Sequence, residues 1–275
     1  MSGTLYIVGT PIGNLGDMSP RAVETLQKVD FIAAEDTRVS LKLLNHFEIK
    51  KPMVSYHEHN RAECGERILA RLSAGENCAI VTDAGMPAIS DPGEDLVRLC
   101  RTSGVTVCSV PGPSAVITAV ALSGMDCSRF CFEGFLSADK SERRSRLNEL
   151  KGEVRTMVFY EAPHKLMRTL RDMAAVLGGE RQVSVAKELT KLHEQVMLMT
   201  LDEAVRHFEA NEPRGEYVLV VAGAQKAEGE MTVEQAVELA ASYVDEGLTA
   251  SKAAARAAAD SGFAKGQIYK LLVTE

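Results

Sequence analysis

The hydrophobic and polar positions of the first 122 residues repeat a strand, loop and helix pattern. A short apolar run typical of a buried strand is followed by a polar or glycine-rich loop and then by apolar residues at helical spacing. The apolar runs lie at residues 5–8, 31–34, 53–56, 79–82 and 105–110. Strands that alternate with helices in this way predict an α/β domain over residues 1–122.

The loop at residues 83–93, with the sequence DAGMPAISDPG, is the central feature of this domain. It contains two glycines and two prolines, and it is longer than the few residues that a strand-to-helix connection needs. Ligands of α/β sheets bind outside the carboxyl ends of the strands, and Asp83 lies at such an end. We therefore interpret this segment as a binding loop.

Three further strand ends carry unusual segments: GTPIGNLG at 9–16, EDTR at 35–38 and PGPSA at 111–115. The first has neither the G-x-G-x-x-G nor the G-K-[ST] pattern of nucleotide phosphate sites. The second places two carboxylates and a guanidinium at one strand end, which requires a solvated rim; a purely structural ion pair is the alternative. We expect all these loops at one edge of the sheet, where they form a ligand site.

The second half, residues 127–225, repeats the arrangement with strands at 130–135, 156–160, 183–186 and 217–222. Polar residues again follow the strands. A polar loop at 136–146 and the segment 164–171 are rich in basic residues. Either segment alone is typical of a solvated surface, and the two together are a stronger indication of a patch that contacts phosphates. The candidate RNA-binding residues are Lys140, Arg143, Arg144, Arg146, His164, Lys165 and Arg168.

The remaining residues, 229–275, are predicted to form a small helical extension. A charged linker of sequence QKAEGE precedes a capping box at 232–235, and helices are expected to about 246, over 249–260 and over 265–272. Close short helices with Gly262 between them match a helix-turn-helix outline. RNA contact and a helical cap or dimer contact are equal alternatives here.

Composition narrows the class of protein. The formal net charge of −7 disfavours a protein that coats nucleic acid non-specifically. Six scattered cysteines, without a C-x-x-C pair or histidines at ligand spacing, indicate reduced thiols and no metal site. With no leader-like start and no apolar run of membrane-spanning length, we expect a cytoplasmic protein that does not enter a membrane.

The motifs named above, together with SYHEHN at 55–60 and KELTK at 187–191, closely resemble the ribosomal RNA small subunit methyltransferase I family, in the tetrapyrrole methylase-like class. The resemblance covers essentially the whole chain. It implies two α/β domains with S-adenosyl-L-methionine in the cleft between them, a homodimer, and 2'-O-methylation of a cytidine ribose in 16S rRNA. The substrate would be small-subunit ribosomal RNA or the assembled small ribosomal subunit.

The resemblance also assigns residues by position. The cofactor would be lined by Pro11, Asp83, Ala84, Gly85, Met86, Ile89, Ser114, Ala115, Tyr160, Leu189 and Glu216. A ribose hydroxyl is a weak acid, so a base or a cation near the acceptor oxygen would help the transfer. The candidates are Asp36 or Glu161 as base and Arg38 or Lys187 as cation. Met86 and Lys165 depart mildly from the family pattern, and the segment 136–140 lacks its usual proline.

Two other functions fit the same pattern. The first is a methyltransferase of this fold that acts on a small molecule such as a tetrapyrrole precursor, which the basic segments and the helical extension disfavour. The second is a non-catalytic cofactor-binding module, which the many ionisable residues at the predicted strand ends disfavour.

Overall fold

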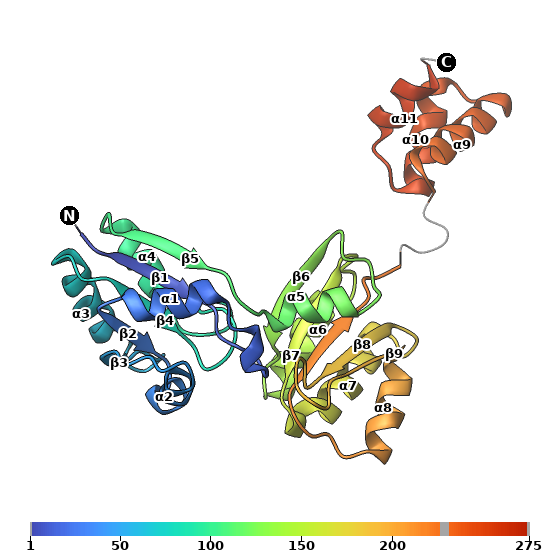
Figure 1. Cartoon of the computed structure of the whole chain (residues 1–275). Coiled ribbons are helices and arrows are strands. Elements are labelled where there is room, and N and C mark those ends of the chain that lie inside the picture. The colour runs from blue at the N-terminus through green and yellow to red at the C-terminus, as the bar shows by residue number, and fades with distance from the viewer. Residues whose placement is uncertain (1, 226–230, 274–275) are drawn as a thin grey trace. The chain divides into compact units, whose positions relative to one another are not determined.

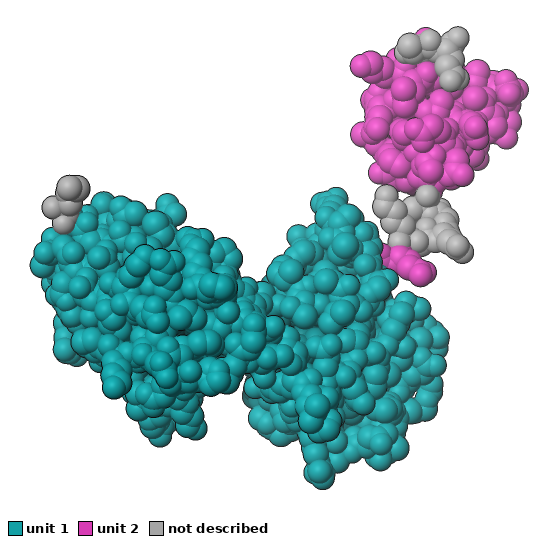
Figure 2. Space-filling model, in the orientation of Figure 1, with its two compact units in different colours: residues 1–223 teal, residues 224–275 magenta. Residues whose placement is uncertain are grey.

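A computed structural model describes residues 2–225 and 231–273. The chain divides between Gly223 and Ala224 into two compact units (Figure 2). The larger unit holds both predicted α/β domains, and the smaller holds the helical extension. Within the described residues, no helix is both long and apolar enough to cross a membrane.

The first sheet is fully parallel, with strand order β3-β2-β4-β1-β5 (Figure 1). Its strands are β1 (Thr4–Val8), β2 (Phe31–Ala34), β3 (Met53–Ser55), β4 (Cys78–Val81) and β5 (Thr106–Val110). Apolar residues of α1 (Pro20–Lys28) and α2 (Thr37–His46) cover one face, and those of α3 (Arg61–Ser73) and α4 (Glu94–Thr102) cover the other. Because every strand runs in the same direction, all the unusual loops leave from one edge, as predicted.

The second sheet is mixed, with order β6-β7-β10-β8-β9. β6 and β7 are parallel, whereas β10 pairs antiparallel with β7 and β8, and β9 pairs antiparallel with β8. The strands are β6 (Phe130–Phe135), β7 (Thr156–Glu161), β8 (Gln182–Lys187), β9 (Gln195–Thr200) and β10 (Tyr217–Val221). α5 (Ala115–Leu122) packs on one face of this sheet.

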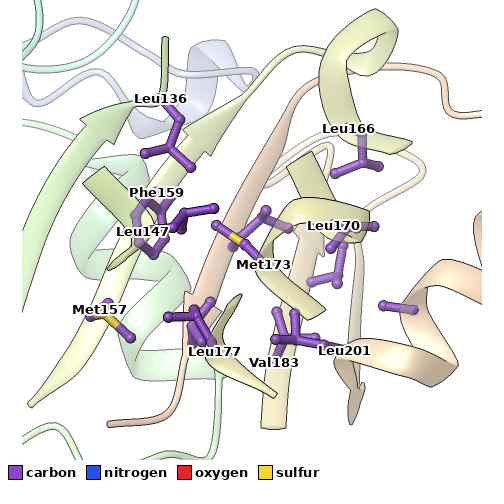
Figure 3. Packing of buried hydrophobic residues seen from close by; sticks show 14 of the residues in the cluster. Leu136, Leu147, Met157, Phe159, Leu166, Leu170, Met173, Leu177, Val183 and Leu201 are labelled. Atoms are coloured by element: carbon purple, nitrogen blue, oxygen red, sulfur yellow. The ribbon is translucent and has the colours of Figure 1, made fainter. Parts of the chain in front are cut away.

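The opposite face carries the largest core of the protein (Figure 3). It is covered by α6 (Lys140–Glu149), α7 (Pro163–Leu177) and α8 (Leu201–Ala210). Leu147, Leu170 and Leu201, one from each helix, are fully buried against strand residues such as Phe159. This core fixes the positions of the strand ends that carry the candidate site.

One sequence prediction in this half is wrong, and two elements were missed. The segment 136–146 is not a loop throughout, because α6 begins at Lys140; the Asp139 carboxylate caps the helix by accepting hydrogen bonds from the amides of Ser141 and Glu142. In addition, β9 and α8 were not predicted. The capping box between Thr200 and Glu203 opens α8 and is the sequence signal that identifies it.

The smaller unit is a three-helix bundle of α9 (Val233–Asp245), α10 (Ala250–Ser261) and α11 (Lys265–Leu272). The predicted capping box between Thr232 and Gln235 opens α9. Alanines of α9 and α10 pack against the fully buried Ile268 of α11, so the bundle has its own core. Of the expected linker at 225–230, all but Gln225 lies outside the described residues.

Candidate active site

The larger unit contains a cavity of about 380 Å³, at the carboxyl edge of the first sheet and against the second sheet. Residues from both sheets line it. Those from the first half are Ile12, Ala84, Gly85, Met86, Ile89, Ser90, Asp91, Ser114 and Ala115. Those from the second are Phe135, Tyr160, Glu161, Ala162, Pro163, Leu189, Glu216, Tyr217 and Val218.

The loop after β1 is joined to the loop after β4 by a pair of backbone hydrogen bonds. The Thr10 amide donates to the Gly85 carbonyl at 2.9 Å, and the Gly85 amide donates to the Thr10 carbonyl at 3.1 Å. The buried Thr10 hydroxyl donates to the Thr82 carbonyl at 3.1 Å. The wall of the cavity formed by Ile12 and Gly85 is therefore rigidly cross-linked.

The loop after β4 also holds strained backbone. Ala88 and Ser90 have φ values of 69° and 61°, a region that residues with a Cβ atom rarely occupy. The Ala88 amide donates to the Pro92 carbonyl at 3.3 Å and closes the turn around them. Strain of this kind persists where the surrounding structure imposes it and gathers at ligand sites. It directs Asp91, which lies inside this turn, to the cavity.

The cavity is acidic. Asp91, Glu161 and Glu216 line it, and no lysine, arginine or histidine is found among its described lining residues. Burial, reinforced by the negative charges of Glu35 and Asp83, raises the pKa of Asp91 to about 7. An unpaired, half-buried carboxylate favours a cationic ligand, which would compensate its charge.

Glu161 is buried at the end of β7, with 3% of its surface exposed. One carboxylate oxygen accepts from the Thr169 hydroxyl at 2.5 Å, and the other accepts from the Ala162 amide at 2.9 Å. Both donors are neutral. Each oxygen keeps further lone pairs, so the group is fixed in orientation and is still able to accept a hydrogen bond or a proton.

Glu216 is held by a lysine on the neighbouring loop. The Lys191 ammonium lies 2.9 Å from a Glu216 carboxylate oxygen and 3.0 Å from one of Glu188. The same loop carries Leu189, which is buried and forms part of the apolar wall. This bridge sets the position of Leu189 and Glu216 together.

The structure gathers most of the predicted cofactor residues. Nine of the eleven line the cavity, namely Ala84, Gly85, Met86, Ile89, Ser114, Ala115, Tyr160, Leu189 and Glu216. Pro11 and Asp83 do not line it, although each is next in sequence to a lining residue.

Of the four predicted catalytic residues, only Glu161 lines the cavity. Asp36 caps α2 and forms an ion pair of 2.7 Å with Arg38, whose side chain is 87% exposed. The Arg38 side chain and amide hold the pKa of Asp36 at about 2. The observed contacts of Asp36 and Arg38 are therefore those of the structural ion pair that the sequence analysis gave as the alternative. Lys187, at the end of β8, is also absent from the described residues that line the cavity.

The predicted RNA-binding residues are not equivalent. Lys140, Arg144, His164 and Arg168 are exposed and Lys165 is half-buried, whereas Arg143 is buried. The Arg143 guanidinium donates to the Asp172 carboxylate at 2.6 and 2.9 Å. Its inclusion among phosphate-binding residues is wrong, because its charge is already matched inside the core. Arg146 is partly exposed but pairs with Glu133 and Glu149.

Eight lining residues were not predicted: Ile12, Ser90, Asp91, Phe135, Ala162, Pro163, Tyr217 and Val218. Ser90 and Asp91 lie within the loop interpreted as a binding loop, and the sequence could have suggested them. Phe135 carries no such signal, since it is one of several phenylalanines in an apolar strand.

Comparisons with known proteins identify the class of enzyme to which this fold belongs. The sequence pattern of the family described as Tetrapyrrole (Corrin/Porphyrin) Methylases matches residues 4–205. The fold also matches the crystal structure of uroporphyrin-III-C-methyltransferase from Thermus thermophilus, with a TM-score of 0.56 and 17% identity over 79% of this chain and 94% of that one. The chain belongs to the tetrapyrrole methylase family, whose members depend on S-adenosylmethionine.

Relatives that match over most of their length identify the family within this class. The chain is 48% identical over 270 residues to "Ribosomal RNA small subunit methyltransferase I" of Synechocystis sp., covering 98% of this chain and 97% of the relative. A protein of the same name from Thermotoga maritima is 50% identical over 221 residues, which are 80% of this chain and 99% of the relative. The chain therefore belongs to the ribosomal RNA small subunit methyltransferase I family.

The cavity fits the cofactor of this family. S-adenosylmethionine carries a positively charged sulfur and an ammonium group, and the cavity offers the half-buried carboxylate of Asp91, which has no ion-pair partner among the described residues. Ile12, Met86, Leu189 and Val218 supply apolar surface for the adenosine and for the carbon chain of the methionine part. The acidic and apolar residues that line the cavity are of the kinds that suit this cofactor.

Proposed function

We propose that this protein transfers the methyl group of S-adenosylmethionine to the ribose 2'-oxygen of a cytidine in small-subunit ribosomal RNA. The observation that supports this most directly is the acidic cavity, in which a buried, doubly hydrogen-bonded carboxylate, Glu161, lies beside the surfaces that suit the cofactor. Membership in the ribosomal RNA methyltransferase family points to the RNA.

The cofactor would be held by residues of both halves of the larger unit. Asp91 would face its positive charges, Glu216 would line the site while bound to Lys191, and Met86 and Leu189 would cover its apolar parts. When bound, it supplies an electrophilic methyl group on a sulfur that leaves as a neutral thioether, so acid assistance to the leaving group is unnecessary.

The chain's own contribution is orientation, exclusion of water and a base. Orientation of a bound acceptor is worth ~7–11 kcal/mol of the barrier in well-aligned systems. Glu161 is the candidate base, because it faces the cavity and its two neutral donors fix its oxygens without a cation. It would take the proton of the ribose hydroxyl as the new carbon–oxygen bond forms, and later release it to water.

The RNA would contact basic residues outside the cavity. Lys140, Arg144, His164, Lys165 and Arg168 remain candidates on the larger unit, all exposed or half-buried. On the bundle, α10 and α11 carry four basic residues and one acidic residue, whereas α9 is acidic. The Thermotoga relative is matched over almost its whole length by 80% of this chain, whereas the Synechocystis relative matches 98%, so we infer that about a fifth of this chain is present in some members of the family and absent from others.

A homodimer remains a prediction, and α5 is where we expect the second copy. This helix is apolar on all sides, and a helix of that kind is normally buried. Nevertheless Ile117 is 57% exposed and Leu122 is 47% exposed. Sedimentation of the wild-type protein and of Ile117→Glu tests this; monomeric wild-type protein at micromolar concentration would contradict it.

The central experiment is transfer of radiolabelled methyl from S-adenosylmethionine to small ribosomal subunits from cells that lack this protein, with naked ribosomal RNA in parallel. Nuclease digestion then locates the label. We expect label on one cytidine ribose, and RNA binding that weakens steeply with salt. Label on a small-molecule acceptor such as a tetrapyrrole precursor, and none on RNA, would replace this proposal.

A further inference from the structure

Among the described residues, Phe135 is the only phenylalanine that is largely exposed, with 57% of its surface accessible. It is the last residue of β6, and it lines the cavity. Ile89, on the loop after β4, lines the same cavity and is 51% exposed. An aromatic ring and an aliphatic side chain therefore stand exposed at one site.

A β-bulge decides where the Phe135 ring points. Phe132 pairs with Val158, but the next pairs are Gly134 with Phe159 and Phe135 with Tyr160, so the register shifts by one residue at Glu133. Side chains alternate between the two faces of a sheet, and a shift of one residue moves a side chain to the other face. The bulge therefore places Phe135 on the same face as Tyr160, beside the cavity.

Other contacts hold this bulge in place. The carboxylate of the inserted Glu133 is 9% exposed and accepts two hydrogen bonds from the Arg146 guanidinium, at 2.6 and 3.1 Å. Gly134 has a φ of 66°, which favours glycine at this position. The position of Phe135 is thus held by the bulge, which the ion pair of Glu133 with Arg146 and the left-handed backbone of Gly134 stabilise.

The ring has a partner on one side. Its centroid lies 5.4 Å from that of Tyr160, and Tyr160 in turn packs edge-on against Phe132 at 5.0 Å. Tyr160 is half-buried and fixed by these contacts. Phe135 is nevertheless 57% exposed where it lines the cavity, so its ring offers apolar surface to a planar ligand group.

We propose that Phe135 is the surface on which the base of the acceptor nucleotide stacks. This inference rests on the proposed function, because it concerns the nucleotide whose ribose is methylated. Proteins that act on single-stranded or unstacked RNA bases commonly stack them on aromatic side chains. Base and ribose are joined in one nucleotide, so a stacked base would restrict the 2'-hydroxyl to the neighbourhood of Glu161, which lines the same cavity.

The test compares Phe135→Leu, which keeps an apolar side chain, with Phe135→Trp, which keeps an aromatic one. Val154→Ala is the matched control, since Val154 is 58% exposed and does not line the cavity. For each variant we would measure cofactor affinity by calorimetry, the KM for small ribosomal subunits, and thermal unfolding. A stacked base lost from the site weakens binding by roughly 5- to 150-fold.

We expect Phe135→Leu to raise the KM for RNA within this range while the cofactor affinity and the unfolding temperature remain those of the wild type. Phe135→Trp should keep a KM close to that of the wild type. An unchanged KM in Phe135→Leu, with wild-type protein active on RNA, would overturn the stacking role alone. A fall in cofactor affinity would assign the ring to the cofactor instead.

Failure of the proposed function gives a different result. Wild-type protein that binds S-adenosylmethionine but labels no RNA would remove both proposals at once. Reduced unfolding temperature in Phe135→Leu together with a raised KM in Phe135→Trp would show that the ring serves packing of Tyr160, and would also overturn the stacking role.

Discussion

Gly9 and Gly112 lie in direct backbone contact. A Cβ atom on Gly112 would stand 2.8 Å from the Gly9 Cα, and one on Gly9 would stand 2.7 Å from the Gly112 Cα and from the Met86 sulfur. Contacts this short essentially never occur between real atoms of these kinds. The loop after β1 and the loop before α5 can therefore meet at the cavity only because both residues are glycine.

Gly112→Ala should lower both stability and cofactor affinity. The added methyl group meets backbone, which cannot rotate away, and overpacking of this kind costs about 1–3 kcal/mol. Urea unfolding and calorimetric titration with S-adenosylmethionine measure the two effects. Gly152→Ala is the control, since a Cβ there meets nothing within 4 Å; equal behaviour of the two variants would contradict the prediction.

Cofactor affinity should depend on pH through Asp91. Its pKa of about 7 means that protons compete with a cationic ligand for the carboxylate below neutrality. We expect affinity to fall by up to about tenfold per pH unit as pH drops from 7 to 5 and to level off above 8. Calorimetry across this range measures the slope, and Asp91→Asn should show weaker binding and a flatter profile.

The same group should make the cofactor-free protein less stable at higher pH. The pKa of Asp91 is raised in the folded state, so the folded protein binds more protons than the unfolded chain between about pH 4 and 7. Stability attributable to Asp91 is therefore lost as pH rises through this window. Asp91→Asn should raise the unfolding temperature at pH 8 and leave it nearly unchanged at pH 4, as differential scanning fluorimetry can show.

Glu161→Gln should slow methyl transfer by roughly 10²- to 10⁴-fold, the usual contribution of a positioned base. Gln is close to Glu in shape, so cofactor affinity should stay near that of the wild type. Single-turnover rates separate the two quantities. Thr169→Val leaves the carboxylate but removes the hydrogen bond to one oxygen; a rate equal to that of Glu161→Gln would indicate that position, not proton transfer, is the main contribution.

Arg143→Ala should destabilise the fold by about 3–5 kcal/mol, the cost of breaking a buried ion pair from one side. Its loss leaves the buried Asp172 carboxylate with only the longer contact of 3.6 Å to Arg144. Arg144→Ala removes only a contact of 3.6 Å to Asp172 from a side chain that is 45% exposed, so it should destabilise the fold much less, as urea unfolding measures, but should weaken RNA binding. If Arg143→Ala retained full stability and lost RNA affinity, Arg143 would return to the RNA-binding set.

The residues of the candidate site could be predicted where they lie in short sequence motifs at the ends of strands. Nine of the cofactor residues assigned by the family resemblance line the cavity, because each lies in a short motif at or beside the end of a strand. Asp36 and Arg38 also follow such a strand, but they bond to each other and lie outside the lining. A strand end shows only that a residue reaches the ligand edge of the sheet, and not which way its side chain turns.

The amino-acid sequence by itself determined the strands of the first sheet, most helices and the capping box that opens α9, because apolar periodicity and cap hydrogen bonds involve neighbours in the chain. The tertiary structure alone decided that Arg143 is buried against Asp172 and that Phe135 faces the cavity. The first depends on the packing of α6 on α7, and the second on a one-residue shift between β6 and β7. Such relations join residues far apart in the chain, and their energies are set only when the elements pack.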